Sequence, residues 1–256
     1  MLTNPQLRHF EAFGYVFLRQ LFDGHEMARL TETFDHTLQE VRNNGDDARD
    51  QSLVEQVETT PGLCWLLEDG RILDGVEELA GADFIWGGSE CNITAHGSHP
   101  WHADRFGSSE TEFTRVKVMI YLDETRADHG CLRVLPGSHR DPYHTTLEPL
   151  LAQDEGVAER TLGVSGEDVP SVFVEAAPGD VLFFNQTLWH GVFNSFPGRR
   201  FVALKFAERP SSSVHIRSLD KYSAGVVFRP HVALVEHSDP RLRGMVAGLV
   251  DLAPAR

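Results

Sequence analysis

Hydrophobic positions in the first part of the chain recur every three or four residues. Between residues 24 and 41 this spacing predicts an amphipathic helix with one apolar face. Its apolar positions are Met27, Leu30, Phe34, Leu38 and Val41. Asn4 followed by Pro5 is typical of a helix start, and residues 50–80 carry further helical patterns with breaks at glycine and proline. Residues 1–82 are therefore expected to be mainly helical.

From about residue 83 the pattern changes to short runs of β-branched and aromatic residues between glycine and proline turns. These runs cover residues 84–86, 116–122, 132–135, 172–174, 181–184 and 201–206. Many short strands between such turns predict a sandwich or barrel, here a jelly-roll-type β core over residues 83–210. Residues 140–170 are acidic and loop-like, with a short helix expected at 148–153.

The remaining residues, 211–256, are expected to form an irregular tail with a weak helix near 239–250. No internal repeat, low-complexity tract or linker divides the chain. The sequence thus predicts one domain over residues 1–256, mainly β, with helices before the jelly-roll core and a tail after it.

The charge balance disfavours one class of partner. With 38 acidic and 23 basic residues among 256, the formal charge is −15, which repels phosphate backbones, so no nucleic-acid partner is expected. A charged small-molecule substrate remains compatible with this balance, because a local pocket can oppose the sign of the whole surface.

The sequence shows neither a membrane segment nor a secretory address. No stretch approaches the roughly 18 apolar residues of a membrane span, and no basic segment followed by an apolar run opens the chain. The three cysteines, Cys64, Cys91 and Cys131, form no CxxC pair and are expected to be reduced thiols. We therefore expect a cytoplasmic protein without a membrane partner; these features do not predict its oligomeric state.

A metal site is indicated by His102, Asp104 and His190. Residues two apart on an extended segment point the same way, so His102 and Asp104 can reach one metal together. His190 lies 86 residues after Asp104 and follows the strand expected at 181–184. Two histidines and one carboxylate on one face leave open positions, as in non-haem iron(II) oxygenases, although the same ligands can also hold a hydrolytic zinc.

Two adjacent arginines are candidates for binding the far carboxylate of a 2-oxo diacid. Arg199 and Arg200 follow a proline-glycine turn after His190 and open the strand expected at 201–206. The planar guanidinium can bind a carboxylate through two hydrogen bonds. Because successive side chains alternate between the faces of a strand, only one arginine should point toward the metal.

Four motifs of this chain resemble the phytanoyl-CoA dioxygenase (PhyH-like) family of iron(II)- and 2-oxoglutarate-dependent oxygenases. They are HPWHADR at 99–105, VKVMIYLDETRADHGCLRVLPGSHR at 116–140, PGDVLFFNQTLWHGVFN at 178–194 and RRFVALKF at 199–206. The segment 10–30 also looks like the opening of that family. The resemblance implies a double-stranded β-helix (jelly-roll, cupin-like) core preceded by helices, and iron(II), 2-oxoglutarate and dioxygen as metal, co-substrate and oxidant.

The resemblance also implies roles for individual residues. The metal ligands would be His102, Asp104 and His190, and Arg199 fits the register of the co-substrate arginine, with Arg200 as the fallback. Some members carry a hydroxyl two residues after the last histidine, where this chain has Val192.

Further departures from the family pattern concern neighbouring positions. Some relatives have a lysine on the strand before the metal motif; this chain does not, and Asn92 or Thr94 could serve instead. Related halogenases have a small residue at the position of Asp104, so a carboxylate there argues for hydroxylation rather than halogenation.

Weaker candidates surround these residues. Arg105 directly follows the metal motif and could bind an anionic group of the substrate, or pair with Asp104. Lys117 and Tyr121 share one face of the strand expected at 116–122, where Lys117 could contact co-substrate or substrate and Tyr121 the substrate. His96 and His99 are out of register with the metal motif and are expected to be loop histidines.

Together these features predict a dioxygenase that hydroxylates an unactivated C–H bond of a small molecule or secondary metabolite, releasing succinate and CO2. Two alternatives stay open at this stage. One is a zinc or manganese hydrolase, which needs the three metal ligands but no anchoring arginine. The other is a non-catalytic jelly-roll barrel that binds a ligand.

Overall fold

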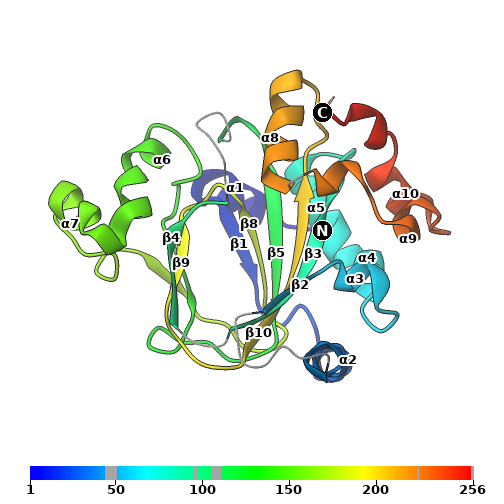
Figure 1. Ribbon diagram of the computed structural model, residues 1–256, viewed down its shortest axis with the longest axis horizontal. Coiled ribbons are helices and arrows are strands. Elements are labelled where there is room, and N and C mark those ends of the chain that lie inside the picture. Colours follow the sequence, from blue (N-terminus) through cyan, green and yellow to red (C-terminus); the bar gives the residue numbers. More distant parts are fainter. Residues whose placement is uncertain (44–50, 95–96, 105–110, 224, 255–256) are drawn as a thin grey trace.

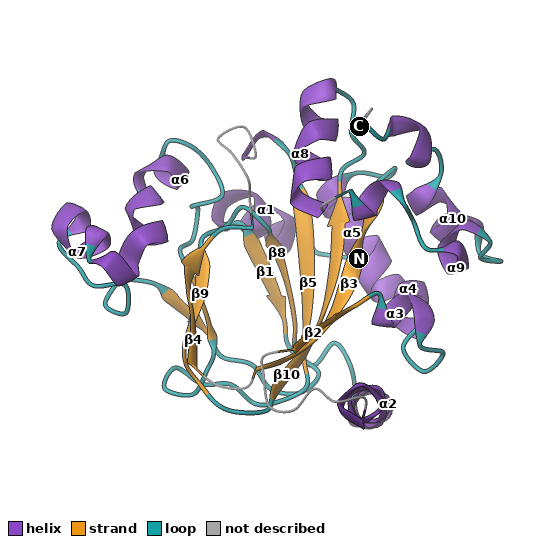
Figure 2. Cartoon of the chain, in the orientation of Figure 1, coloured by secondary structure: helices purple, strands orange, loops and turns teal. Residues whose placement is uncertain are grey.

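The computed structural model describes residues 1–43, 51–94, 97–104, 111–223 and 225–254. Two antiparallel sheets face each other across a central gap (Figures 1 and 2). The larger sheet has the order β1-β8-β5-β10-β3-β2 and the smaller sheet the order β4-β9-β6-β7. The strands are β1 (Tyr15–Leu18), β2 (Gln51–Val54), β3 (Ile85–Thr94), β4 (Gly97–His102), β5 (Arg115–Tyr121), β6 (Leu132–Val134), β7 (Val172–Val174), β8 (Val181–Asn185), β9 (His190–Ser195) and β10 (Arg199–Ala207). This is the predicted jelly-roll core, but β1 and β2 extend it beyond the predicted bounds of residues 83–210, into the part expected to be mainly helical.

Helices cover the outer faces of both sheets (Figure 2). The N-terminal ones are α1 (Asn4–Phe13), α2 (Gly24–Asn43), α3 (Gln56–Thr59), α4 (Trp65–Glu68) and α5 (Gly70–Ala80). Beside the smaller sheet lie α6 (Tyr143–Thr146), η2 (Glu148–Glu155) and α7 (Val157–Leu162). The C-terminal ones are α8 (Ser213–Ser223), η3 (Val226–Phe228), α9 (Val232–Val235), α10 (Pro240–Val246) and η4 (Val250–Leu252).

Alternation along the strands divides the apolar core into three clusters. On β10, Val202, Leu204 and Phe206 face outward and pack with the helices against the larger sheet. A second cluster, which includes Met119 and Leu132, fills part of the space between the sheets. The third lies outside the smaller sheet, under α6, η2 and α7. The inner faces of the sheets are thus only partly apolar, which leaves room for polar side chains at the centre.

β3 is longer than the sequence pattern suggested. It begins within the run predicted at 84–86 and continues through Gly87 and Gly88 to Thr94. A bulge there places one extra residue opposite β10, between Lys205 and Phe206, and Gly88 has a φ of +111° that favours glycine. The two glycines therefore bend the strand; they do not end it.

The expectation for the tail was wrong. The described residues between 211 and 254 are largely helical, with α8 before the helix expected near 239–250. The buried residues of α8 are His215, Ser218 and Leu219, so two of the three are polar and its apolar stripe is weak. Residues 140–170 also contain more helix than expected, since α6, η2 and α7 occupy most of that segment. No helix in the described part of the chain is long and apolar enough to cross a bilayer.

Asp180, just before β8, connects this strand to the segment after β1 through hydrogen bonds and an ion pair. Its side chain is buried and accepts hydrogen bonds from Gln20 N and Ala177 N, at 2.8 and 2.9 Å. It also forms an ion pair with Arg19 at 2.8 Å. Burial alone would raise the pKa of Asp180, but the backbone hydrogen bonds and Arg19 outweigh it, so the pKa lies below its ordinary value.

We predict that Asp180→Asn lowers the free energy of unfolding by about 2 kcal/mol at neutral pH, because it removes the charge that these donors stabilise. Urea denaturation measures this loss. The exposed Asp251→Asn is the matched control and should change stability by less than about 0.5 kcal/mol. A carboxyl with a lowered folded-state pKa stabilises the fold above its unfolded pKa of about 4, so the difference between wild type and Asp180→Asn should shrink as the pH falls through the folded-state pKa. A pH-independent difference would contradict this account.

Candidate active site

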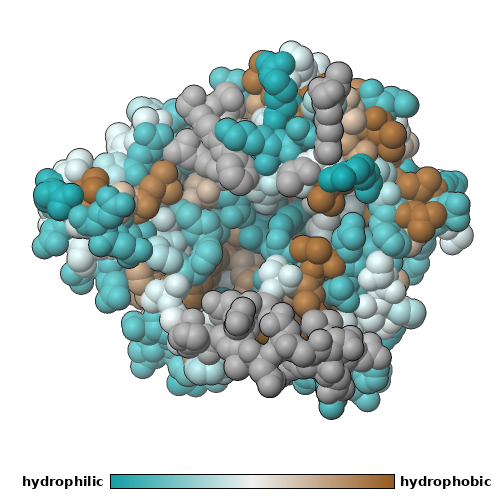
Figure 3. Space-filling model, in the orientation of Figure 1, coloured by the Kyte–Doolittle hydropathy of each residue, from teal (hydrophilic) through white to brown (hydrophobic). Residues whose placement is uncertain are grey.

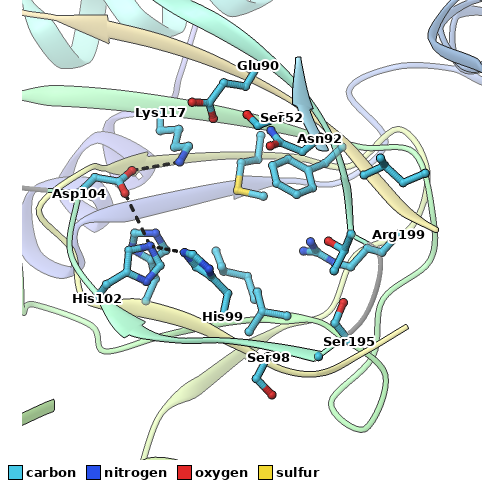
Figure 4. A pocket seen from close by; sticks show the side chains of 18 of the residues that line it. Ser52, Glu90, Asn92, Ser98, His99, His102, Asp104, Lys117, Ser195 and Arg199 are labelled. Carbon is cyan, nitrogen blue, oxygen red and sulfur yellow. Dashed lines mark hydrogen bonds and ion pairs between the residues drawn. The ribbon is translucent and has the colours of Figure 1, made fainter. Parts of the chain in front are cut away.

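Pairing of β4 with β9 brings the predicted metal ligands together. His102 lies directly opposite His190 in the register of these strands, and Asp104 follows β4 by two residues. One ligand atom from each of the three side chains lies within 4.8 Å of the others. Figure 4 shows His102 and Asp104 converging at one end of a cavity. Within the described part of the chain, this is the group of histidine, cysteine and acidic side chains whose spacing suits a metal ion.

Both histidines are oriented by backbone carbonyls. His102 Nδ1 lies 2.8 Å from Pro100 O, and His190 Nδ1 lies 2.7 Å from Leu188 O. A carbonyl oxygen only accepts, so each Nδ1 carries the proton and each Nε2 presents its lone pair. Metal-binding histidines in proteins are held in this way. Burial also lowers the pKa of both rings, to about 3 for His190, which keeps them neutral as metal binding requires.

Asp104 is held by its backbone and by one carboxylate oxygen. Its N–H donates to Gln186 O at 2.8 Å, and its carbonyl accepts from Arg115 at 3.1 Å. Oδ2 accepts from Lys117 Nζ at 3.0 Å, while Oδ1 lies 3.6 Å from His102 Nε2. Burial opposes ionisation, but the charge and hydrogen bond of Lys117 outweigh it and hold the pKa of Asp104 far below its ordinary value. Oδ1 is therefore a charged oxygen placed among neutral imidazoles, and this donor set fits iron(II).

The metal ligands line a cavity of about 630 Å³ between the two sheets. The space-filling view is hollowed near its centre, in front of this gap (Figure 3). Residues of β10 that face the space between the sheets lie beside residues of its neighbouring strands, β3 and β5, in successive cross-strand layers. These layers are Arg199 with Thr94, Phe201 with Asn92 and Tyr121, and Lys205 with Lys117. Arg199 and Lys205 are six residues apart, or roughly 20 Å along the strand, so they mark opposite ends of the row.

Arg199 points into this cavity (Figure 4). Arg200 is not among the residues that line it. Arg199 is 3% exposed, and its Nε and Nη2 lack a hydrogen-bond partner among the described residues. Arg200 lies on the other face of β10, where it pairs with Asp35 at 2.6 Å and with Asp123 at 2.7 Å. Buried guanidinium donors without an acceptor are costly, which indicates that a ligand supplies one to Arg199.

Only some of the other co-substrate and substrate candidates line the cavity. Asn92, Thr94 and Lys117 line the cavity, and Asn92 Nδ2 is buried without a hydrogen-bond partner in the described structure. Tyr121 is not among the described lining residues. Its ring centroid lies 6.0 Å from Arg199 Cζ, and its buried hydroxyl has no partner among the residues described. Arg105 and His96 lie outside the described residues.

The placement of His99 differs from the sequence expectation. His99 belongs to β4, lines the cavity, and its Nε2 lies 3.2 Å from His102 Nε2. Residues three apart on a regular strand face opposite sides, but β4 has one extra residue between these positions relative to β9. The extra residue reverses the alternation, and Pro100, a residue typical of bulges, lies within this segment.

Sequence reasoning also missed Glu90, Lys205 and Tyr222, which line the same cavity. Lys205 lies within the run predicted at 201–206, whereas Glu90 lies in the part of β3 beyond the run at 84–86; both are charged residues among apolar or small ones. That was the available signal. Tyr222 comes from α8, a helix the pattern did not predict.

Comparisons with known proteins agree with this geometry. Residues 10–195 match the sequence profile described as phytanoyl-CoA dioxygenase (PhyH). An ectoine dioxygenase from Sphingopyxis alaskensis is 24% identical, over 74% of this chain and 70% of that protein. The solved structure of HygX from Streptomyces hygroscopicus with nickel and 2-oxoglutarate bound is 19% identical, with a TM-score of 0.63 over 81% of this chain and 87% of that one. The structure of EvdMO1 has a TM-score of 0.62 at 22% identity over 81% of this chain, which spans 50% of that longer chain.

We predict that His190→Ala weakens Mn(II) binding by more than about 100-fold, beyond the roughly 10- to 100-fold effect of residues that only orient a ligand. Calorimetric titration of Mn(II) into the metal-free protein measures the affinity. His99→Ala is the matched control, since His99 is close to His102 but outside the group of three, and it should change the affinity by less than about tenfold. An equal loss in the two variants would make His99 a metal ligand and contradict the assigned set.

Proposed function

The chain belongs to the phytanoyl-CoA dioxygenase family, and we propose that it hydroxylates an unactivated C–H bond of a small molecule, releasing succinate and CO2. Its reaction class is that of a non-haem iron dioxygenase dependent on 2-oxoglutarate, with iron(II), 2-oxoglutarate and dioxygen as metal, co-substrate and oxidant. One observation carries the proposal: a two-histidine, one-carboxylate group and a buried, unpartnered arginine share one cavity.

We assign the metal to His102, Asp104 and His190. Bound iron supplies the activation of dioxygen that side chains alone cannot perform. The protein holds the ligands in place before the metal arrives, through carbonyl contacts to both imidazoles and through Lys117 on Asp104 Oδ2. Because Lys117 occupies Oδ2, Asp104 offers the metal one oxygen and leaves room for other ligands.

We assign the far carboxylate of 2-oxoglutarate to Arg199. Its unpartnered Nε and Nη2 form one edge of the guanidinium, which suits a carboxylate bound through two hydrogen bonds. Tyr121 is proposed as the second donor, in place of the hydroxyl that Val192 lacks. Burial raises the pKa of Tyr121, so its hydroxyl stays protonated and can donate. Asn92 and Thr94 remain further candidates along the same wall.

A small-molecule substrate is supported by the size of the cavity and by relatives: one is named for ectoine, and HygX has been solved with hygromycin B bound. Arg105 is retained as a proposed substrate contact. A single domain over residues 1–256 and a cytoplasmic location also remain proposals. The hydrolase alternative shares the metal ligands but gives no role to the unpartnered Arg199, and the ligand-binding alternative gives no role to the group of three metal ligands.

We predict that Arg199→Gln raises the dissociation constant of 2-oxoglutarate by roughly 10- to 100-fold, because two charge-assisted hydrogen bonds are lost. Anaerobic titration of the iron(II)-loaded protein, followed by the weak visible absorption band of the metal–2-oxo acid chelate, measures this constant. Arg200→Gln is the matched control, one residue away on the opposite face, and should shift it by less than about threefold. No band in iron-loaded wild type would contradict the proposed function and favour the alternatives.

A separate prediction concerns Tyr121. Tyr121→Phe keeps the ring beside Arg199 and removes only the hydroxyl, so 2-oxoglutarate affinity should fall by roughly three- to tenfold. The same titration measures it. Unchanged affinity would remove Tyr121 from the co-substrate site and leave Arg199 as the anchor.

A further inference from the structure

Lysines are rare in this chain and concentrated at the active site. The sequence contains three, Lys117, Lys205 and Lys221, against 20 arginines. Two of the three, Lys117 on β5 and Lys205 on β10, line the cavity and lie directly opposite each other on neighbouring strands. Like charges in such a pair destabilise a sheet unless other groups compensate.

Two carboxylates compensate these lysines. Lys117 Nζ contacts Asp104 at 3.0 Å, and Lys205 Nζ forms an ion pair with Glu90 on β3. Burial would raise the pKa of Glu90, but the two lysines outweigh it and lower the pKa, so Glu90 is charged. We call Asp104, Lys117, Glu90 and Lys205 the charged row. With two acids and two lysines, it is neutral in the protein alone.

Binding of a metal and 2-oxoglutarate, which rests on the proposed function, changes the charge balance of this row. A divalent metal is compensated by Asp104 and by the near carboxylate of 2-oxoglutarate, and the far carboxylate is compensated by Arg199. Asp104 then no longer balances Lys117. The rest of the charged row, Lys117, Lys205 and Glu90, carries a net charge of +1 beside the metal, at the end of the cavity away from Arg199. This positive site lies inside a protein whose formal charge is −15.

We propose that the substrate carries a carboxylate that binds Lys205 on the charged row, next to Lys117. Lys205 is 17% exposed and Glu90 21%, so both groups are partly screened from water yet reachable from the cavity. Tyr222 on α8 lines the cavity at the same end, where its ring centroid lies 5.9 Å from Lys205 Nζ, and Ser52 on β2 lines the cavity opposite Asn92. Lys117 connects this site to Asp104, so a carboxylate held here would place the adjoining carbon chain near a metal bound by His102, Asp104 and His190.

The three lysines also provide the test. Protein labelled with ¹³C at lysine Cε is loaded with diamagnetic Zn(II) and saturating 2-oxoglutarate, and its three lysine signals are followed by NMR. Acetate and acetamide are the probes, because they have the same shape and differ in charge. At constant ionic strength, acetate should shift the Lys205 and Lys117 signals to saturation. Acetamide should leave them in place, and the exposed Lys221 is the internal control.

Variants distinguish the carboxylate site from acetate bound to the metal. In Lys205→Gln, acetate affinity read from Lys117 should fall roughly tenfold or more. Glu90→Gln removes a competing anion, so acetate should bind as tightly as in wild type or more tightly. Lys221→Gln should change nothing.

Three results would overturn the proposal. The first is an equal response of the lysine signals to acetate and acetamide, and the second is no saturable response of Lys205 to acetate. The third is an equal loss of acetate affinity in Lys205→Gln and Glu90→Gln, which would assign the lysine–glutamate pair to a zwitterionic ligand. The absorption band of the iron(II)–2-oxoglutarate chelate distinguishes failure of the carboxylate-site proposal from failure of the proposed function. A normal band without an acetate response counts against the carboxylate site alone, whereas a missing band counts against the proposed function.

Discussion

The antiparallel register between β4 and β9 is the constraint on which the active site depends. It places His102 opposite His190, although 88 residues separate them in the chain. A slip of one residue would turn one imidazole to the outer face of the smaller sheet, where Trp101 and Trp189 now pack in an apolar cluster. Packing of those two tryptophans on the outer face therefore stabilises the register that places the proposed metal ligands on the inner face.

The second constraint is the electrostatic cost of a polar interior. The fold encloses Arg199, Lys117, Asp104 and Glu90 between its sheets, and buried charge destabilises a protein unless it is paired. Three of these groups find partners within the chain. The buried Nε and Nη2 of Arg199 have no such partner among the described residues, and the proposed function assigns the far carboxylate of 2-oxoglutarate to them. In that proposal, co-substrate binding would offset the cost of burying this unpaired charge.

Several features of the site could be predicted because they depend on local geometry. The spacing of His102 and Asp104 placed both on one face, and alternation required that only one of Arg199 and Arg200 point inward. Alternation also put Lys117 and Tyr121 on one face, although only Lys117 lines the cavity. His99 was misassigned because strict alternation fails at a bulge, and a bulge is defined by the pairing partner as much as by the strand itself.

By itself, the sequence determined the class of fold, the position of most strands and the residue types that bind a metal and a carboxylate. Those properties follow from short-range periodicity and from side-chain chemistry, both of which can be read within a few residues. Only the tertiary structure decided that His99 lies beside His102, that α8 brings Tyr222 to the cavity, and that Lys117, Glu90 and Lys205 form one charged row. These groups come from strands and a helix far apart in the chain, and their meeting depends on which strands pair and in what register. No local pattern encodes that choice, because it is made by the burial of all the apolar faces at once.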